Sequence, residues 1–291
     1  MNTQGIEEQI KTKARRLGAA AVGIADVSAI NAYAPEGYRP DNLLQGARSV
    51  IVVAGAPTFA GAWKGTNARY MGIMPNFPTV RRAVTTNLAN FFEVEHGYEA
   101  VQYDAALESG FTPFLSLKLC AEMAGLGTRA LAGGVVLNGS YGLLSLAAVI
   151  TTMPLKADQR PDRQVCPHPA CVRMWEKRRT TPCLSSCEAL AGELEAGQIK
   201  WMRYNRQLCA TRCQNTSVGA FQKMLCEIIN ELNPEKRKLL IFSDFFGRTI
   251  RAIAFGSELV AQCWSCLKSC PVCRPNRSAA KIIQLPKGVE A

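Results

Sequence analysis

The chain is 291 residues long and 48% of its residues are hydrophobic, which is enough for one large or two ordinary domains with apolar cores. A small scaffold held together by disulfides alone is therefore excluded. The formal net charge is +11, but the basic residues are scattered along the chain, so a solvated basic surface is a simpler interpretation than a nucleic-acid interface.

The first half of the chain alternates helix-like and strand-like patterns. Residues 6–17 carry apolar side chains at helical spacing and precede an apolar run that ends near Val27, which predicts a helix followed by a buried strand. The β-branched run at 49–57, bounded by glycine and proline, predicts a buried central strand. A further helix is predicted over 79–95 and a further strand over 98–103.

The pattern continues to a polar boundary. A helix is predicted over 113–124, closed by Gly125, and two apolar runs separated by Asn138-Gly139 predict a tight hairpin. These elements make an α/β (or α+β) domain over residues 1–155. Residues 156–164 are polar and contain proline, which predicts a linker. It leads into a second domain, over residues 156–291.

The second half has weaker periodicity, with helices predicted over 187–196 and 218–232. The longest apolar run, at 143–153, is shorter than the roughly 18 residues that span a bilayer. The start of the chain is polar and charged and shows no export signal. We therefore expect a cytoplasmic protein without a membrane partner, in a compartment where thiols stay reduced.

The cysteines carry the most specific signal. Eleven of the twelve follow residue 165, and only Cys120 precedes it. Near the end, Cys263, Cys266, Cys270 and Pro271 form the pattern C-x2-C-x3-C-P. In bacterial two-cluster ferredoxins the cysteine before proline ligates the other cluster. The sequence therefore predicts a ferredoxin-like domain with two 4Fe-4S clusters.

Cysteines further upstream must complete these clusters. We predict a crossed ligation, in which each cluster takes cysteines from both the upstream set and the C-terminal set. One cluster takes Cys166, Cys171, Cys183 and Cys270. The other takes Cys187, Cys209, Cys263 and Cys266.

Other interpretations of the cysteines stay open. Two zinc sites would need the same eight thiolates, although zinc ribbons lack the C-x2-C-x3-C-P triplet. Cys120 and Cys226 lie in apolar helical patterns, which indicates ordinary buried thiols. Cys213 and Cys273 lie within reach of a predicted cluster, and either could replace a neighbour in the assignment.

Hydrolytic and nucleotide-dependent chemistry have little support. His96 and His168 are the only histidines, and neither belongs to a recognisable catalytic triad or ligand set. No GxGxxG or GxxxxGK[ST] segment stands between a strand and a helix.

Several segments together are similar to one known family. They are LGAAAVGIADV, SVIVVAGAP, AEMAGLG, YGLLSLAAVITT and the eight-cysteine pattern, in which Cys209 stands alone well before the last three. Over residues 6–273 the chain resembles the superfamily of epoxyqueuosine reductases and reductive dehalogenases. The resemblance implies a nitroreductase-like N-terminal domain, a two-cluster ferredoxin-like domain, and a corrinoid (cobalamin) bound between them.

The resemblance also implies reductive chemistry at cobalt. The clusters would pass low-potential electrons singly to the corrinoid, and a donor such as ferredoxin or flavodoxin would reduce the clusters. The substrate would be a small molecule. Epoxyqueuosine reductases have an acidic residue where this chain has Gly110 and Phe111, and a tryptophan where it has Thr128. We therefore do not expect tRNA as the substrate.

The resemblance further suggests residues near the corrinoid. Gly125, Gly127 and Gly142 would let the backbone approach a large flat cofactor, although core packing or turn formation explains them equally well.

The candidate proton donors are Tyr141, Lys118 and Asp104. Tyr141 ranks first because a phenol can deliver a proton to a bound substrate. A strand tyrosine packed against the sheet is the other interpretation.

Two further functions remain alternatives to a reductase of an unidentified substrate. One is an electron-transfer or corrinoid-reactivating protein with no organic substrate of its own, which the missing acidic residue favours. The other is a protein whose N-terminal domain binds flavin or no cofactor.

Overall fold

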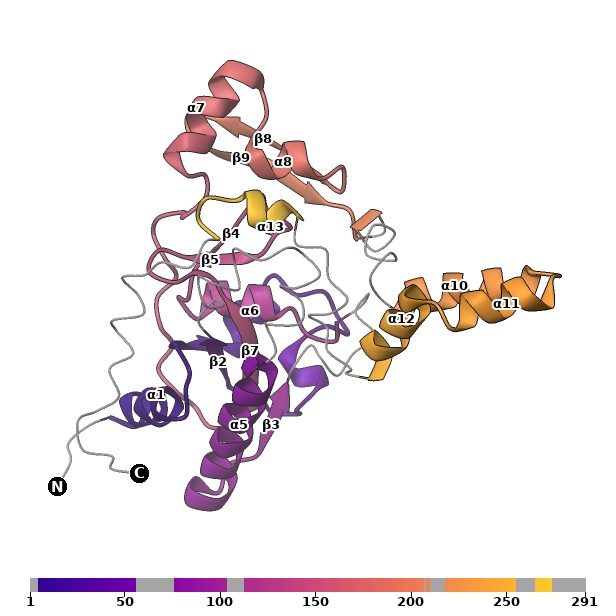
Figure 1. Ribbon diagram of the computed structural model, residues 1–291. Helices are drawn as coiled ribbons and strands as arrows, with labels where there is room; N and C mark the ends of the chain where they lie inside the picture. Colours follow the sequence, from indigo (N-terminus) through magenta and orange to yellow (C-terminus); the bar gives the residue numbers. More distant parts are fainter. Residues whose placement is uncertain are drawn as a thin grey trace, which may run out of the picture.

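Figure 1 shows a computed structural model of the chain, which describes residues 5–55, 76–103, 113–206, 208–209, 218–254 and 265–273. The first elements are α1 (Ile6–Arg16), β1 (Ala21–Asp26), α2 (Val27–Asn31), the 3-10 turn η1 (Pro40–Asn42), β2 (Ser49–Gly55), α5 (Asn76–Asn90), the π-helical turn η2 (Phe91–Glu95) and β3 (Ala100–Tyr103). Next come α6 (Leu117–Met123), β4 (Thr128–Arg129), β5 (Val136–Asn138), β6 (Gly142–Leu143) and β7 (Ser145–Thr151). Within these ranges no helix combines the length and apolar character that crossing a bilayer requires.

The cysteine-rich half follows. Its elements are α7 (Pro169–Arg178), α8 (Pro182–Ser186), β8 (Leu190–Glu195), β9 (Gln198–Tyr204), α10 (Val218–Asn230), α11 (Pro234–Ile241), α12 (Asp244–Ala254) and α13 (Ser265–Ser269).

A four-stranded sheet forms the centre of the N-terminal half. Its order is β1-β2-β7-β3, and every neighbouring pair is antiparallel. All seven residues of β2 are buried, so the prediction of a buried central strand is confirmed. In the register, Ile51 of β2 lies between Ile24 of β1 and Val149 of β7. The fold is therefore a mixture of helix and sheet in which the sheet itself is antiparallel.

One face of this sheet is covered by α1 and α5. Alternate side chains of a strand point to opposite faces, and Ile51 and Val53 of β2 pack with Ile10 of α1 and Leu88 of α5. Ile10 and Leu88 are completely buried, and each such burial contributes roughly 1.5–3 kcal/mol. The helix predicted over 79–95 is α5 continued by η2, and His96 ends it as expected.

The opposite face is covered by α2 and α6. Val50 and Val52 of β2 pack there with Cys120 of α6, which is fully buried, so the prediction of an ordinary core thiol is confirmed. The helix α6 is shorter than predicted. It begins only after Ser116, whose side chain accepts a hydrogen bond from the Leu119 amide at 3.3 Å and so caps the first turn.

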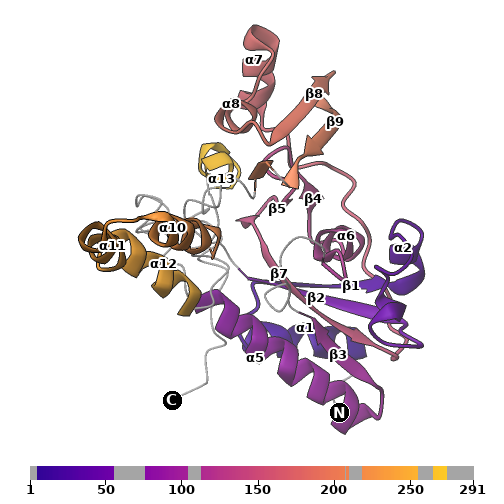
Figure 2. The same cartoon turned by 90° about the vertical axis from the view of Figure 1, so that its right-hand side faces the viewer.

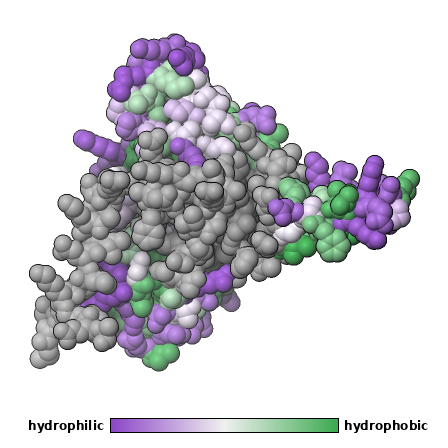
Figure 3. Space-filling model, in the orientation of Figure 1, coloured by the Kyte–Doolittle hydropathy of each residue, from purple (hydrophilic) through white to green (hydrophobic). Residues whose placement is uncertain are grey.

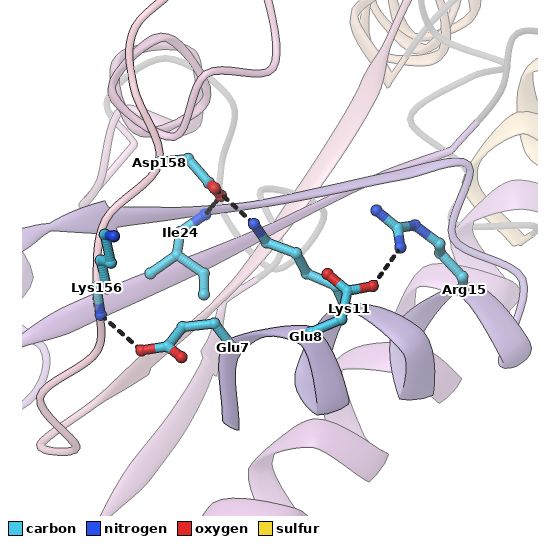
Figure 4. A network of polar contacts seen from close by, with 7 residues as sticks. All are labelled: Glu7, Glu8, Lys11, Arg15, Ile24, Lys156 and Asp158. Carbon is cyan, nitrogen blue, oxygen red and sulfur yellow. Dashed lines mark hydrogen bonds and ion pairs between the residues drawn. The ribbon is translucent and has the colours of Figure 1, made fainter. Parts of the chain in front are cut away.

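The segment predicted as a linker is fastened to the N-terminal domain (Figure 4). Asp158 accepts hydrogen bonds from the Ile24 amide at 2.8 Å and from the Lys11 ammonium group, and the Lys156 amide donates to Glu7 at 3.0 Å. The Lys156 amide is the largest reason why the pKa of Glu7 lies below its usual value. The linker therefore has a defined path across α1 and β1.

The prediction of a helix over 187–196 is wrong. Residues 190–195 form β8, which pairs antiparallel with β9. Ala196 and Gly197 both have positive φ angles, 48° and 76°, and two such residues in succession form the tight turn that joins hairpin strands. Cross-strand pairing and burial of Leu190 and Leu194 here outweigh the helix propensity of the segment.

Three helices project from the rest of the molecule (Figures 1 and 2). The prediction over 218–232 is confirmed by α10, and Phe221 of α10 stacks on Phe246 of α12 with 5.6 Å between ring centroids. Apolar side chains are exposed along this arm, among them Leu232 and Phe242. Figure 3 shows green, hydrophobic patches on the arm beside purple, hydrophilic ones. Cys226 is also exposed, so its prediction as a buried thiol is wrong.

Candidate metal centre

Four cysteines from separate segments line one pocket. They are Cys166, Cys171, Cys183 and Cys270, and all four are buried. The other lining residues are Leu131, Ala132, His168, Thr181, Pro182, Pro271 and Val272. These four cysteines are the ones that the crossed assignment predicts for the first cluster.

Local sequence explains how two of them reach the pocket. Pro169 opens α7 and Pro182 opens α8, a position that suits proline because the first helical N–H has no partner in the helix. The caps are His168, whose Nδ1 atom accepts from the Ala170 amide at 3.2 Å, and Thr181, whose hydroxyl accepts from the Leu184 amide at 3.4 Å. Both caps also line the pocket, so the helix starts hold Cys171 and Cys183 against it.

The pocket disfavours thiolates that have no cation beside them. Burial raises the pKa of Cys166 to about 12 and that of Cys171 to about 11, and it also raises the pKa of Cys183. The neighbouring cysteines contribute to each of these shifts in the same direction. A metal centre deprotonates its thiols and supplies the positive charge that stabilises them.

Cys273 lies against this set and is completely buried. Its hydrogen bond with Cys270 lowers the pKa of Cys270 and raises the pKa of Cys273. The sequence identified Cys273 as a possible replacement ligand, and its contact with Cys270 keeps that possibility open.

The donor set fits an iron–sulfur cluster. Thiolates are the ligands that such clusters use, and the four cysteines of the pocket are free thiols. The Thr181 hydroxyl is 3.3 Å from Cys183 Sγ, within the range of a hydrogen bond to sulfur.

The buried Nε1 atom of Trp175, one helical turn after Cys171, has no hydrogen-bond partner among the described residues. Among those residues, no three His, Cys, Asp or Glu side chains are arranged around a single metal ion.

The second predicted set is described in part. Cys187 is buried at the end of α8, and Cys209 and Cys266 are half-buried in the same apolar cluster. The helices α8 and α13 are joined by the hydroxyls of Ser186 and Ser269, 3.2 Å apart. Cys263 and Cys213 lie outside the described residues.

Lys118 lies near this second set. Its Nζ atom donates to the Gly133 carbonyl at 3.2 Å and lies 5.6 Å from the centre of the Tyr204 ring. The pKa of Lys118 is lowered to about 8, mainly by burial and in part by the charges of two arginines. Cys209 and Cys266 act in the opposite direction and raise this pKa.

Tyr141, another proton-donor candidate, lies in the turn between β5 and β6. Its amide donates to the Asn138 side chain at 3.1 Å and its ring packs against the core formed by β2 and α6. Asp104 lies outside the described residues, so its place relative to the other two candidates stays a prediction.

The candidate corrinoid glycines contact protein backbone. A Cβ on Gly125 would lie 2.4 Å from the Gln159 carbonyl oxygen, and a Cβ on Gly127 would lie 2.3 Å from that of Leu137. Gly125 and Gly142 also have positive φ angles. Close packing and turn formation, one of the two interpretations from the sequence, thus account for these glycines.

Sequence reasoning missed several pocket residues. Leu131 and Ala132 come from the N-terminal half, and no local pattern connects them with the cysteines. Thr181 could have been found, because a threonine directly before Pro182 and a short helix has the pattern of a helix cap.

No family model matches the chain, and no curated protein matches it by sequence. Solved structures do match. Selenomethionine-labelled epoxyqueuosine reductase aligns over 93% of this chain and 67% of its own, with a TM-score of 0.53 and 19% identity. The epoxyqueuosine reductase of Bacillus subtilis aligns over 94% of this chain and 67% of its own, with a TM-score of 0.54 and 16% identity. The chain has the fold of epoxyqueuosine reductase.

A dehalogenase also matches. The catabolic reductive dehalogenase NpRdhA, in complex with 3-bromo-4-hydroxybenzoic acid, aligns over 88% of this chain and 37% of its own, with a TM-score of 0.50 and 17% identity. The resemblance predicted from the sequence is thus confirmed at the level of the fold, and the chemistry has to be argued from the residues of this chain.

Proposed function

We propose that this chain is an iron–sulfur oxidoreductase that passes single electrons from two 4Fe-4S clusters to a corrinoid, for the reduction of a small-molecule substrate. The observation that carries the proposal is the pocket lined by Cys166, Cys171, Cys183 and Cys270. Three of these cysteines lie before β8 and the fourth follows α13, in agreement with the crossed ligation predicted from Cys270-Pro271.

The proposed domains follow from this assignment. Residues 1–155 form a nitroreductase-like domain that binds the corrinoid and the substrate, and residues 156–291 form the ferredoxin-like domain. Leu131 and Ala132 line the cysteine pocket, which supports close contact between the two. The free thiols of the cysteine pocket suit a reducing, cytoplasmic compartment.

The protein's own residues have distinct roles in this proposal. A bound corrinoid supplies reductive chemistry at cobalt. Eight cysteines would hold the clusters, and the Thr181 hydroxyl would donate to Cys183 once that residue is a thiolate. Tyr141 holds a proton on its phenol oxygen for transfer to the substrate. A low-potential donor such as ferredoxin or flavodoxin reduces the clusters.

The sequence supports a second candidate function. Its basis is the pair Gly110 and Phe111, which replaces the acidic residue of the epoxyqueuosine reductases. One of the matching reductases is described with an aspartate-bearing catalytic loop swung out of its active site, and another with a tRNA stem loop. Without that acid, the chain would deliver electrons to a corrinoid or to a partner protein and would have no organic substrate of its own.

Two measurements test the proposal. Protein prepared without oxygen should contain about eight iron and about eight sulfide per chain, as two 4Fe-4S clusters require. Adding hydroxocobalamin should then change the absorption spectrum in proportion to bound corrinoid. Stoichiometric zinc without iron would refute the iron–sulfur assignment. Clusters without corrinoid binding would refute the reductase and favour electron transfer.

A further inference from the structure

A glycine turn lies between Lys118 and Cys266. The Lys118 Nζ atom donates to the Gly133 carbonyl at 3.2 Å, and a Cβ placed on Gly134 would lie 3.9 Å from the same Nζ atom. A Cβ placed on Gly133 would lie 3.8 Å from Cys266 Sγ. The ammonium group and the cysteine sulfur therefore both lie beside the same two-residue turn.

This turn depends on glycine. Gly133 and Gly134 have φ angles of +66° and +61°, a conformation that costs other residues roughly 1–2 kcal/mol each. Two left-handed residues in succession keep the chain tightly folded at this point. The turn can therefore hold the lysine and the cysteine near each other.

The partners of Lys118 leave its charge available to anions. They are a neutral carbonyl and the face of the Tyr204 ring. Among the ion pairs of the described residues, none joins Lys118 to a carboxylate. Its charge interacts with the anionic forms of Cys209 and Cys266, and also with the cations Arg206 and Arg129. In contrast, the lining of the first cysteine pocket includes no lysine or arginine from the described residues.

We propose that Lys118 selectively raises the reduction potential of the cluster held by Cys209 and Cys266, an inference that rests on the proposed function. When this cluster accepts one electron from a low-potential donor, its net charge falls by one and no bond is broken. A fixed positive charge beside the Gly133-Gly134 turn stabilises the more negative, reduced form. Lys118 acts through its charge and need not contact the substrate.

The test is a redox titration of the full chain with both clusters loaded, followed by EPR, and it needs no substrate. In Lys118→Gln, one cluster should become harder to reduce, with about a tenfold lower ratio of reduced to oxidised form at fixed potential, or about 59 mV for one electron. Lys118→Arg keeps the charge and should restore the wild-type value. Lys200→Gln removes a lysine whose side chain is 45% exposed and should change neither cluster.

Ligand variants identify the affected cluster. In a Cys166→Ala background, which removes the first cluster, the remaining signal should still respond to Lys118→Gln. In a Cys209→Ala background the remaining signal should not respond. If the glutamine variant does not fold, Lys118→Met gives the same comparison. Equal shifts in both backgrounds, or no shift in either, would overturn the inference.

Failure of the proposed function gives a different result. Wild-type protein without iron would refute the proposed function, and the inference with it. Wild-type protein with two clusters and an unshifted Lys118→Gln would refute only the role of Lys118.

Discussion

The Thr181 hydroxyl lies 3.3 Å from Cys183 Sγ, and both side chains are buried at the start of α8. Once Cys183 is a thiolate, only the hydroxyl can donate in this pair. A hydrogen bond to a charged group contributes about 1.5–3 kcal/mol, and the bond is stronger to the more electron-rich sulfur of a reduced cluster.

We therefore expect Thr181→Val to make the first cluster harder to reduce while the second cluster keeps its potential. Loss of the helix cap should also lower the free energy of unfolding by about 1 kcal/mol. Redox titration and chemical denaturation measure the two effects. Thr181→Ser retains the hydroxyl and serves as the control. An unchanged potential in Thr181→Val would mean that the hydroxyl does not act on the cluster.

The crossed ligation predicts which cysteine variants resemble each other. Cys270→Ala and Cys166→Ala should damage the same cluster, because both side chains line one pocket, whereas Cys209→Ala should damage the other. Iron content and EPR of each variant measure this. Cys226→Ala removes an exposed thiol on α10 and should retain both clusters. Loss of the same cluster in Cys166→Ala and Cys209→Ala would contradict the crossing.

The variant Tyr141→Phe tests whether Tyr141 is the proton donor of the proposed reductase. Tyr141→Phe keeps the ring that packs against the core, so folding, both clusters and cobalamin binding should be unchanged. Turnover of a reducible substrate should be lost, because phenylalanine has no proton to donate. Steady-state assays measure turnover, and spectroscopic titration with cobalamin measures binding, so the two effects can be separated. Undiminished turnover would remove Tyr141 from the mechanism.

Alanine variants of Gly125 and Gly37 separate the two costs of replacing a glycine, which are steric crowding and backbone strain. Gly125 and Gly37 have similar positive φ angles, +74° and +82°, but only a Cβ at Gly125 would meet backbone, 2.4 Å from the Gln159 oxygen. Gly37→Ala should lower the free energy of unfolding by about 1 kcal/mol, the cost of the left-handed conformation. Gly125→Ala should cost clearly more, since the linker must also move. If urea denaturation gives equal decreases in the free energy of unfolding for the two variants, the linker moves away from the new Cβ without cost.

Local sequence by itself determined the elements whose signal is strong over short distances. The β-branched run of β2, the apolar spacing of α1 and α10, and the turn at Asn138-Gly139 each predict an element that the structure contains. Cysteine spacing led to the hypothesis that Cys166, Cys171, Cys183 and Cys270 share a cluster, because ligand geometry constrains spacing along the chain, and these four side chains line one pocket. These features depend on near neighbours, which a single sequence displays directly.

Only the tertiary structure decided the features that depend on distant contacts. Residues 190–195 have helix-forming side chains but form β8, because β9 supplies a pairing partner and the apolar cluster buries Leu194. Leu131 reaches the cysteine pocket, and Gly133 comes near Cys266, through the packing of the two halves against each other. Such contacts join residues far apart in the chain, and their free energy arises only when the fold is complete.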